Sequence, residues 1–462
     1  MDSFRRSSFL SWIPRVLFYL SVFLFHSLQA NDKNPLEHAS VSVYAVHVPT
    51  GNILIDENSK QSMIPASCMK LVTTAAALHL LGPEAFFQTK ISYDGKIEKG
   101  VLQGNLYIVG GGDPCLGSDQ ISSSLSWQEL VKGWVNAVSQ LGIVAIEGKV
   151  IGDASLWEKA LAVGSWSWED LGNYYGAGAS ALSFHENAYS LFFQPSLKEG
   201  EKAMVLRTEP YLSQLVLKNE VITGHEGSGD QACIYGSEFS FIQHVRGTIP
   251  KGVKEFFIRG AIPDPTLACK DAFEHALQEK GILIQNQMKK EGERKVIHAT
   301  RSPSVAEIIH VMNQKSVNLY AEHLFKKMGE ISEGIGSTSS GIKAVQKFLK
   351  EKGIDLSGWN IADGAGLSRK NLITAEQMVA LLVLMKKSEF SPLFLESLPQ
   401  VKGSIRAKSG SMSLVKGCVG YLDDIAFAVF INQCSDSQSV KKKIDDVFAV
   451  LLKKMDENGL KK

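Results

Sequence analysis

Ser67-Cys68-Met69-Lys70 follows Ile64-Pro65-Ala66 and places a hydroxyl group and an amine three positions apart. Residues with this spacing share one face of a helix, so the Lys70 amine can lie within hydrogen-bonding reach of the Ser67 hydroxyl. A serine hydroxyl is a poor nucleophile near neutral pH unless a base contacts it. Alone, the pattern S-x-x-K is a weak signal, because it recurs by chance and usually marks an ordinary helix start.

Two further motifs give this pattern its meaning. Ser316-Val317-Asn318 and Lys408-Ser409-Gly410 follow it in the order S-x-x-K, S-x-N, K-[ST]-G. Each motif alone usually has only a structural role. The first is most often a turn or a helix cap, and the second is usually the end of a strand. The ordered set resembles that of penicillin-binding enzymes and serine β-lactamases. It predicts acyl transfer by a serine nucleophile.

Length and composition indicate an ordinary globular protein. The chain has 462 residues, of which 44% are hydrophobic and 21% are charged, so it is long enough for two or three domains. Its formal net charge of +1 argues against a nucleic-acid partner, which would call for a basic surface. The six cysteines show no C-x-x-C pair and the histidines no H-E-x-x-H, so we expect neither a metal nor a cofactor.

The first thirty residues are typical of a secretory signal. Arg5, Arg6 and Arg15 precede an apolar run over residues 16–28, and we expect cleavage after Ala30. An uncleaved membrane anchor is the alternative, although the run is short for a spanning helix, which needs roughly twenty residues. We therefore expect export to the periplasm.

The two ends of the chain contain regular elements. We expect a hairpin over residues 41–55, an apolar helix over 70–81, and helices that open at the capping boxes of Ser304 and Thr374. Residues 313–318 are expected to form a connecting loop. A strand at 405–408, a hairpin over 415–432 and an amphipathic helix over 440–455 complete this part. The last helix is expected to pack on a sheet; loose contact with a membrane surface is the alternative use of its lysines.

The middle of the chain differs in texture. Residues 90–295 contain short strands, many glycines and one helical segment near 127–141, and no candidate catalytic set. Ser67 and Ser316 lie 249 positions apart, yet they have to meet for the chemistry. The simplest solution is an insertion, because insertions are tolerated where chain ends lie close together. We expect one domain from residues 31–90 and 296–462, interrupted by an inserted region at 91–295.

The motifs assign a role to each candidate catalytic residue. Lysine has an ordinary pKa of about 10.4, so Lys70 can act as a base only if burial or a nearby cation lowers its pKa. Lys408 could be that cation. Ser67 would then attack a carbonyl, Lys70 would take its proton, and Ser316 would relay a proton to the leaving group. Asn318 would hold the substrate amide and orient Lys70.

The third motif is expected to bind substrate. Lys408 and Ser409 would hold a substrate carboxylate, and Gly410 would let the substrate backbone lie close to the strand. The backbone amides of Ser67 and Ser411 would bind the oxyanion, an interaction worth about 3–4 kcal/mol per donor in other acyl-transfer enzymes.

Beyond the motifs, the chain resembles the low-molecular-mass class C penicillin-binding proteins, a D-alanyl-D-alanine carboxypeptidase and endopeptidase family. The matching segments are Pro65–Thr73, Gly112–Leu116, Ser180–Ser183 and Asp363–Arg369. The resemblance implies an α/β (α+β) multidomain fold: a transpeptidase-like catalytic domain with an antiparallel sheet flanked by helices, and a β-rich insertion of two smaller domains. We place the inner of these two at about residues 100–160.

The resemblance also implies a substrate, the stem peptides of peptidoglycan, and covalent inhibition by β-lactams. Family members that recognise the free end of diaminopimelate use an acid, a base and an aromatic residue. The matching positions are Asp170 for the amine, Arg369 for the carboxylate and Tyr175 for the aromatic wall. A zwitterionic group calls for one anion and one cation at a fixed spacing. The alternatives are purely structural roles: Asp170 could cap a loop, and Arg369 could form an ion pair at the surface.

Two other functions fit the same motifs. A β-lactamase would share the acylation step, but the chain has no distinct deacylating motif and carries a large insertion. A non-catalytic wall-binding protein could keep the fold, but the motif residues are intact.

Overall fold

The structure is a computed structural model that describes residues 35–457. The predicted signal segment at 1–30 lies outside these residues. No helix within the described part is long and apolar enough to cross a membrane.

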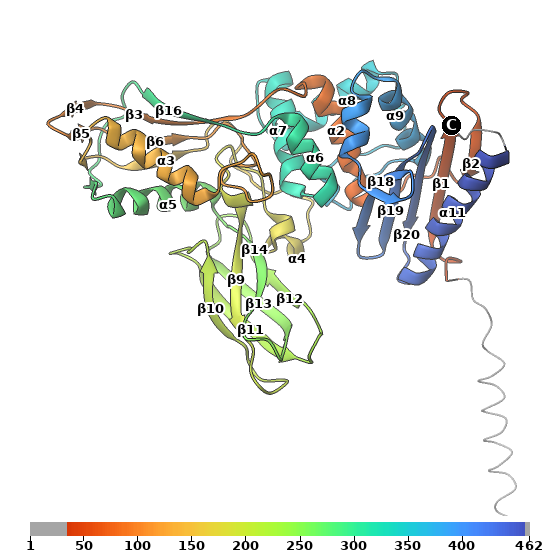
Figure 1. Ribbon diagram of the computed structural model, residues 1–462, viewed down its shortest axis with the longest axis horizontal. Helices are drawn as coiled ribbons and strands as arrows, with labels where there is room; N and C mark the ends of the chain where they lie inside the picture. The colour runs from red at the N-terminus through yellow and green to blue at the C-terminus, as the bar shows by residue number, and fades with distance from the viewer. Residues whose placement is uncertain (1–34, 458–462) are drawn as a thin grey trace, which may run out of the picture.

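The two ends of the chain form one six-stranded antiparallel sheet (Figure 1), in the order β17-β18-β19-β20-β1-β2. Strand β1 pairs with β2 as a hairpin and with β20 along its whole length. The expected hairpins at both ends are therefore confirmed. The strands are β1 (Ser40–His47), β2 (Ile53–Glu57), β17 (Gln400–Lys402), β18 (Ile405–Met412), β19 (Val415–Leu422) and β20 (Ile425–Asn432).

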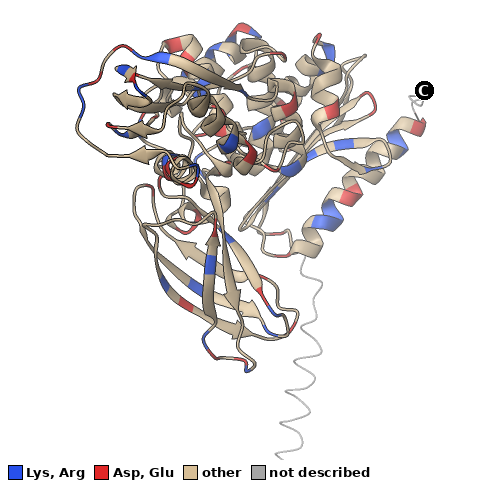
Figure 2. Cartoon of the chain, turned by 60° about the vertical axis from the view of Figure 1, so that its left-hand side comes forward, with Lys and Arg blue, Asp and Glu red and all other residues tan. Residues whose placement is uncertain are grey.

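Both faces of this sheet are buried, because successive side chains of a strand point to opposite sides. On β1, Tyr44 and Val46 belong to the core shared with a group of helices, while Val43 and Ala45 belong to the core under the C-terminal helix α11 (Ser437–Glu457). Helix α11 buries Val447 against this second face, as the amphipathic pattern predicted. Its lysines are interspersed with acidic residues (Figure 2).

The helices on the first face surround a central apolar helix, α2 (Lys70–Leu80). Every residue of α2 from Lys70 to Leu78 is buried, which fits a sequence made mostly of alanine, leucine and valine. The surrounding helices are α6 (Val305–Lys315), α7 (Asn318–Glu333), α8 (Thr338–Glu351), α9 (Ala375–Lys387) and α10 (Ser391–Ser397). This mixed α/β arrangement confirms the expected fold class.

The segment between α6 and α7 is shorter than expected. We predicted a loop over residues 313–318, but α6 continues through Lys315 and α7 begins at Asn318. The capping box of Ser304 starts α6, and Ser316 ends it in the left-handed conformation at φ 58°. Only Ser316 and Val317 lie between the two helices, so two helix ends, and not a loop, position the S-x-N motif.

The chain leaves this domain through β3 (Gln88–Tyr93) and returns through β16 (Lys295–Arg301), and these two strands pair with each other. The outer part of the insertion has two four-stranded sheets, β16-β3-β6-β8 and β15-β7-β5-β4. Their other strands are β4 (Lys96–Glu98), β5 (Val101–Gln103), β6 (Leu106–Val109), β7 (Ala145–Ile146), β8 (Val150–Asp153) and β15 (Leu283–Ile284).

Helix α3 (Trp127–Gln140) agrees with the expected helical segment, but α5 (Pro265–Glu279) was not expected. Its signals are present, because Asp264 caps the helix by accepting a hydrogen bond from the Leu267 amide and Pro265 occupies the first helical position. The helix was not predicted because its neighbours in the sequence are short strands.

A separate hydrophobic core lies within residues 188–262 and includes Tyr189, Phe193, Val221 and Ile258. Its two three-stranded sheets are made by β9 (Ala188–Gln194), β10 (Met204–Glu209), β11 (Val216–Gly224), β12 (Gln231–Tyr235), β13 (Ile242–Pro250) and β14 (Phe256–Ala261). In Figure 1 this unit projects below the rest of the molecule. The inner unit therefore lies at 188–262 and not at about 100–160; those residues contribute to the core of the outer part.

Candidate active site

Ser67 lies in a short 3-10 turn, Ala66–Met69, directly in front of α2. Its hydroxyl oxygen accepts a hydrogen bond of 3.1 Å from the Lys70 amine. The neighbouring Cys68 is fully buried, and its thiol donates to the Lys408 carbonyl. The predicted nucleophile and base are therefore in contact, and Cys68 packs behind them.

Lys70 is fully buried, and its amine has three oxygen acceptors. Besides Ser67 it donates to Asn318 Oδ1 at 2.6 Å and to the Ala365 carbonyl at 2.7 Å. None of the three is a carboxylate. Burial, helped by the charge of Lys408, lowers the pKa of Lys70 to about 7. A substantial fraction of the amine is therefore neutral at pH 7 and able to accept a proton.

Lys408 reaches the site from β18. It is buried, and its amine donates to Ser316 Oγ at 2.9 Å and to the Ser409 carbonyl at 2.8 Å. Ser316 occupies the left-handed conformation, which is uncommon for a residue with a side chain and is found at functional sites. This conformation presents its hydroxyl to Lys408, so S-x-N and K-[ST]-G meet as predicted.

Gly410 is required by the packing of the protein itself. A Cβ atom at this position would lie 2.6 Å from the Pro65 carbonyl oxygen and 3.1 Å from the Ser67 amide nitrogen. Strand β18 therefore lies directly against the nucleophile turn. Ser409 and Ser411, on either side of Gly410, are both exposed, and Ser411 lines the pocket.

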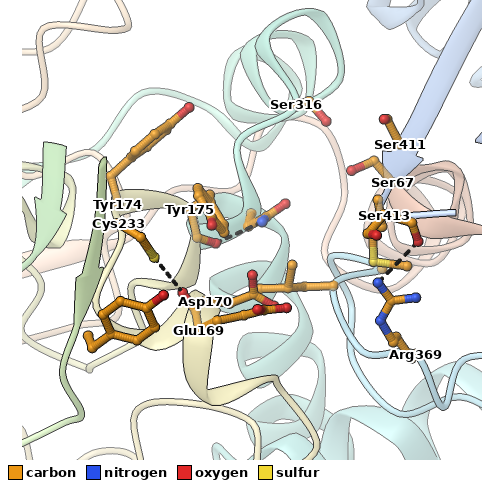
Figure 3. A pocket seen from close by; sticks show the side chains of 15 residues that line it. Ser67, Glu169, Asp170, Tyr174, Tyr175, Cys233, Ser316, Arg369, Ser411 and Ser413 are labelled. Carbon is orange, nitrogen blue, oxygen red and sulfur yellow. Dashed lines mark hydrogen bonds between the residues drawn. The ribbon is translucent and has the colours of Figure 1, made fainter. Parts of the chain in front are cut away.

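Ser67, Ser316 and Asn318 of the three motifs border a pocket of about 570 Å³. Figure 3 shows Ser67 and Ser411 on one side of it and Asp170 and Tyr175 on the other. The pocket is lined by Ser67, Glu169, Asp170, Tyr174, Tyr175, Cys233, Tyr235, Ser316, Asn318, Gly366, Leu367, Arg369, Ser411, Met412 and Ser413. The inserted region thus forms one wall and the catalytic motifs form the other.

All three predicted recognition residues line this pocket. Burial, followed by the charge of Glu169, raises the pKa of Asp170, while Tyr175 and Arg369 lower it in part. The Arg369 guanidinium donates a hydrogen bond to the Ser413 carbonyl. The structure therefore brings an anion and a cation to one pocket, with an aromatic ring beside the anion.

Several residues of the site were missed. Glu322 lies one helical turn after Asn318 and is fully buried, and this spacing could have revealed it. Asn318 also donates to the backbone carbonyl of Tyr175 at 2.8 Å, which no sequence motif indicates. Cys233 and Tyr235 reach the pocket from β12, and no signal in the sequence linked this strand to the site.

Within residues 35–457 no group of three or more His, Cys, Asp or Glu side chains is arranged to hold a metal ion.

Residues 27–455 match the model of the D-Ala-D-Ala carboxypeptidase 3 (S13) family. The chain belongs to this family. It is therefore a serine peptidase related to the penicillin-binding proteins, as the motifs predicted.

Individual relatives agree. A D-alanyl-D-alanine carboxypeptidase from an Actinomadura species is 27% identical over 90% of this chain and 82% of its own. The D-alanyl-D-alanine carboxypeptidase DacB of Haemophilus influenzae is 25% identical over 94% of each chain. The crystal structure of penicillin-binding protein 4 (dacB) from Haemophilus influenzae matches with a TM-score of 0.73 and 23% identity, covering 87% of this chain and 92% of the other. This last likeness concerns the fold alone.

Proposed function

We propose that the protein is a periplasmic serine-type D-Ala-D-Ala carboxypeptidase and DD-endopeptidase that acts on peptidoglycan stem peptides through an acyl-enzyme. The observation that carries the proposal is the Lys70 amine, which is buried, has a lowered pKa, and contacts both Ser67 Oγ and Asn318 Oδ1. A nucleophile and a neutral base in contact are what acyl transfer requires.

In the acylation step Ser67 Oγ attacks the carbonyl of the penultimate D-alanine and Lys70 takes its proton. The backbone amides of Ser67 and Ser411 stabilise the oxyanion. The proton taken by Lys70 is relayed through Ser316, which is hydrogen-bonded to Lys408, to the nitrogen of the leaving D-amino acid, so Lys70 is neutral again. Water then hydrolyses the ester, with Lys70 again as the base.

Substrate binding uses both walls of the pocket. Lys408 and Ser409 bind the terminal carboxylate, and Asn318 binds the substrate amide. Gly410 keeps β18 close to the nucleophile turn and to the substrate. On the wall made by the inserted region Asp170 binds the free amine of diaminopimelate and Tyr175 packs against its side chain. Arg369, which lies beside Ser413 on the side of the three motifs, binds its carboxylate.

β-Lactams fit the proposal as covalent inhibitors, because they acylate the same serine. A solved structure of the Haemophilus influenzae penicillin-binding protein 4 is a complex with a novel β-lactam. The location rests on the arginines and the apolar run of residues 1–30.

The experiment combines a fluorescent penicillin with cross-linked muropeptides. We expect stable labelling that is lost in Ser67→Ala, and release of D-alanine or monomeric peptides by the unchanged protein. Rapid turnover of penicillin without stable labelling would instead indicate a β-lactamase. Absence of any labelling or peptide cleavage would contradict an acyl-enzyme mechanism.

A further inference from the structure

Glu322 is a buried carboxyl group that the mechanism above does not use. It lies on α7, four residues after Asn318, and is fully buried. Its Oε1 atom accepts two backbone hydrogen bonds, from Gly364 at 2.9 Å and from Ala365 at 2.7 Å. Its Oε2 atom has no hydrogen-bond partner among the described residues. One oxygen of this side chain therefore holds a single short segment of backbone.

That backbone segment in turn holds the catalytic helix α2. The Ala365 carbonyl accepts the hydrogen bond of 2.7 Å from the Lys70 amine. The Gly364 carbonyl accepts a hydrogen bond of 2.7 Å from Thr73 Oγ1, one turn further along α2. The amides of Gly364 and Ala365 thus bind Glu322, while their carbonyls bind two residues of α2.

The same helix α7 reaches Lys70 from a second direction. Asn318 Oδ1 accepts from the Lys70 amine directly, and Glu322 acts one turn later through the Ala365 carbonyl. Two of the three acceptors of the amine are therefore set by α7, and the third is the Ser67 hydroxyl. A shift of the Ala365 carbonyl would move the amine relative to Ser67.

The charge state of Glu322 suits this role. Burial, helped by the charge of Asp363, raises the pKa of Glu322 to about 8, so the carboxyl group is largely neutral at pH 7. The charge of Lys326, on the same helix, lowers the pKa of Glu322. The Lys326 amine, however, forms an ion pair with Glu158, with 3.3 Å between Nζ and Oε1. A neutral acceptor holds the two amides without placing a full negative charge beside Lys70, which would favour the protonated form of the base.

We propose that Glu322 is a positioning residue for acylation: through the amides of Gly364 and Ala365 it fixes the Ala365 carbonyl, and this carbonyl fixes the Lys70 amine against Ser67. The inference rests on the proposed acyl-enzyme mechanism and deepens it. Misplacement of a reacting group by about 1 Å can lower a rate about 10²-fold, even when the altered residue does not touch the substrate.

The test uses fluorescent penicillin with the full protein and measures two quantities, the dissociation constant of the non-covalent complex and the rate constant of acylation. We expect Glu322→Met, which lacks both acceptors, to lower the acylation rate constant about 10²-fold with little change in the dissociation constant. Glu322→Asp, which keeps the carboxyl group but withdraws it by one methylene, is the second variant should the first fail to fold. It should lower the same rate constant.

Glu322→Gln keeps an oxygen acceptor at nearly the same place and is neutral, so it should retain most of the acylation rate. Thr73→Val separates positioning from general stability, because it removes a hydrogen bond to the same backbone segment but leaves the Ala365 carbonyl on Lys70. It should lower the melting temperature and change acylation much less than Glu322→Met does. Glu333→Gln, at the exposed end of α7, is the surface control.

Wild-type acylation rates in both Glu322→Met and Glu322→Asp would overturn the inference. So would a fall in acylation that follows the loss of stability equally in Glu322→Met and Thr73→Val. If the unchanged protein is not acylated at all, the proposed function fails instead, and the two failures are thus distinguishable.

Discussion

The side-chain amide of Asn318 donates a hydrogen bond of 2.8 Å to the backbone carbonyl of Tyr175. Asn318 belongs to the S-x-N motif and Tyr175 to the inserted region, so this hydrogen bond joins the two walls of the pocket. Because the other end of the amide accepts from Lys70, the Tyr175 carbonyl also fixes which way the amide faces. The inserted region therefore contributes to the catalytic geometry and does not only flank it.

Asn173 anchors the turn that carries Tyr175. Its side chain donates to the Glu169 carbonyl at 2.7 Å and accepts from the Ile234 amide at 3.1 Å. We expect Asn173→Ala to lower the acylation rate about tenfold, because the buried backbone groups lose their partners and the turn shifts. Labelling with fluorescent penicillin measures the effect. Asn219→Ala removes similar bonds far from the pocket on β11, and equal losses in both variants would contradict the prediction.

The pH dependence of acylation should follow the protonation of Lys70, whose pKa is lowered to about 7. Only the neutral amine can accept the proton of Ser67, and the neutral fraction grows as the pH rises through the pKa. The acylation rate should therefore increase about tenfold per pH unit well below pH 7 and level off above it. Stopped-flow measurement between pH 5 and 9 tests this. A flat profile over the acidic range would exclude Lys70 as the base.

Lys408 contributes to the low pKa of Lys70, because two nearby positive charges disfavour each other. Lys408→Gln removes one of these charges and should raise the pKa of Lys70, which moves the acidic limb of the acylation profile to higher pH. The maximal rate should fall as well, since Lys408 also contacts Ser316. Lys402→Gln, on the exposed strand β17, is the control and should not shift the acidic limb of the pH profile of acylation.

Asp170 should matter for one class of substrate only. A hydrogen bond that involves a charged group is worth about 1.5–3 kcal/mol, so Asp170→Ala should lower the turnover of diaminopimelate-containing peptides about 10- to 100-fold. Simple acyl-D-Ala-D-Ala substrates lack the zwitterionic side-chain end and should be affected much less. The ratio of kcat/KM for the two substrates measures the effect. Equal losses on both substrates would contradict the assignment of Asp170 to the amine of diaminopimelate.

Gly410 and Gly133 offer a matched pair of glycine substitutions. Gly410→Ala would force a methyl group against the Pro65 carbonyl and the Ser67 amide, and such overpacking typically costs about 1–3 kcal/mol. Acylation should fall with it, because the nucleophile turn is displaced. Gly133 lies within α3 with open space around its Cβ position, so Gly133→Ala should stabilise the protein by up to about 1 kcal/mol. Urea unfolding measures both changes.

Local patterns predicted much of the fold. The period-two alternation over residues 41–48 and the turn after it predicted β1 and β2, and the capping boxes of Ser304 and Thr374 predicted the starts of α6 and α9. The structure confirms these elements, because the signals for helix caps and hairpins depend on residues only a few positions apart. Helix α5 was not predicted, although Asp264 and Pro265 mark its start, because its neighbours in the sequence are short strands.

Long-range arrangement was harder to predict. The inner unit of the insertion was placed at about 100–160 but lies at 188–262, because which strands share a core depends on contacts far apart in the sequence. The loop expected at 313–318 is two helix ends joined by Ser316 and Val317. The left-handed conformation of Ser316 allows this, and a serine does not signal it as a glycine would.

The three motifs are enough to predict the chemistry of the site. Motif order alone predicts the roles of Ser67, Lys70, Ser316, Asn318 and Lys408, because a nucleophile, its base and a carboxylate-binding cation require particular side chains. The pKa and the position of the base depend instead on the folded arrangement of the chain. The lowered pKa of Lys70 results from burial within a packed domain, and the partners of its supporting groups, Glu322 and Tyr175, come from segments distant in the chain. Desolvation and hydrogen-bond geometry are properties of the folded chain, so they cannot be predicted from a short sequence motif.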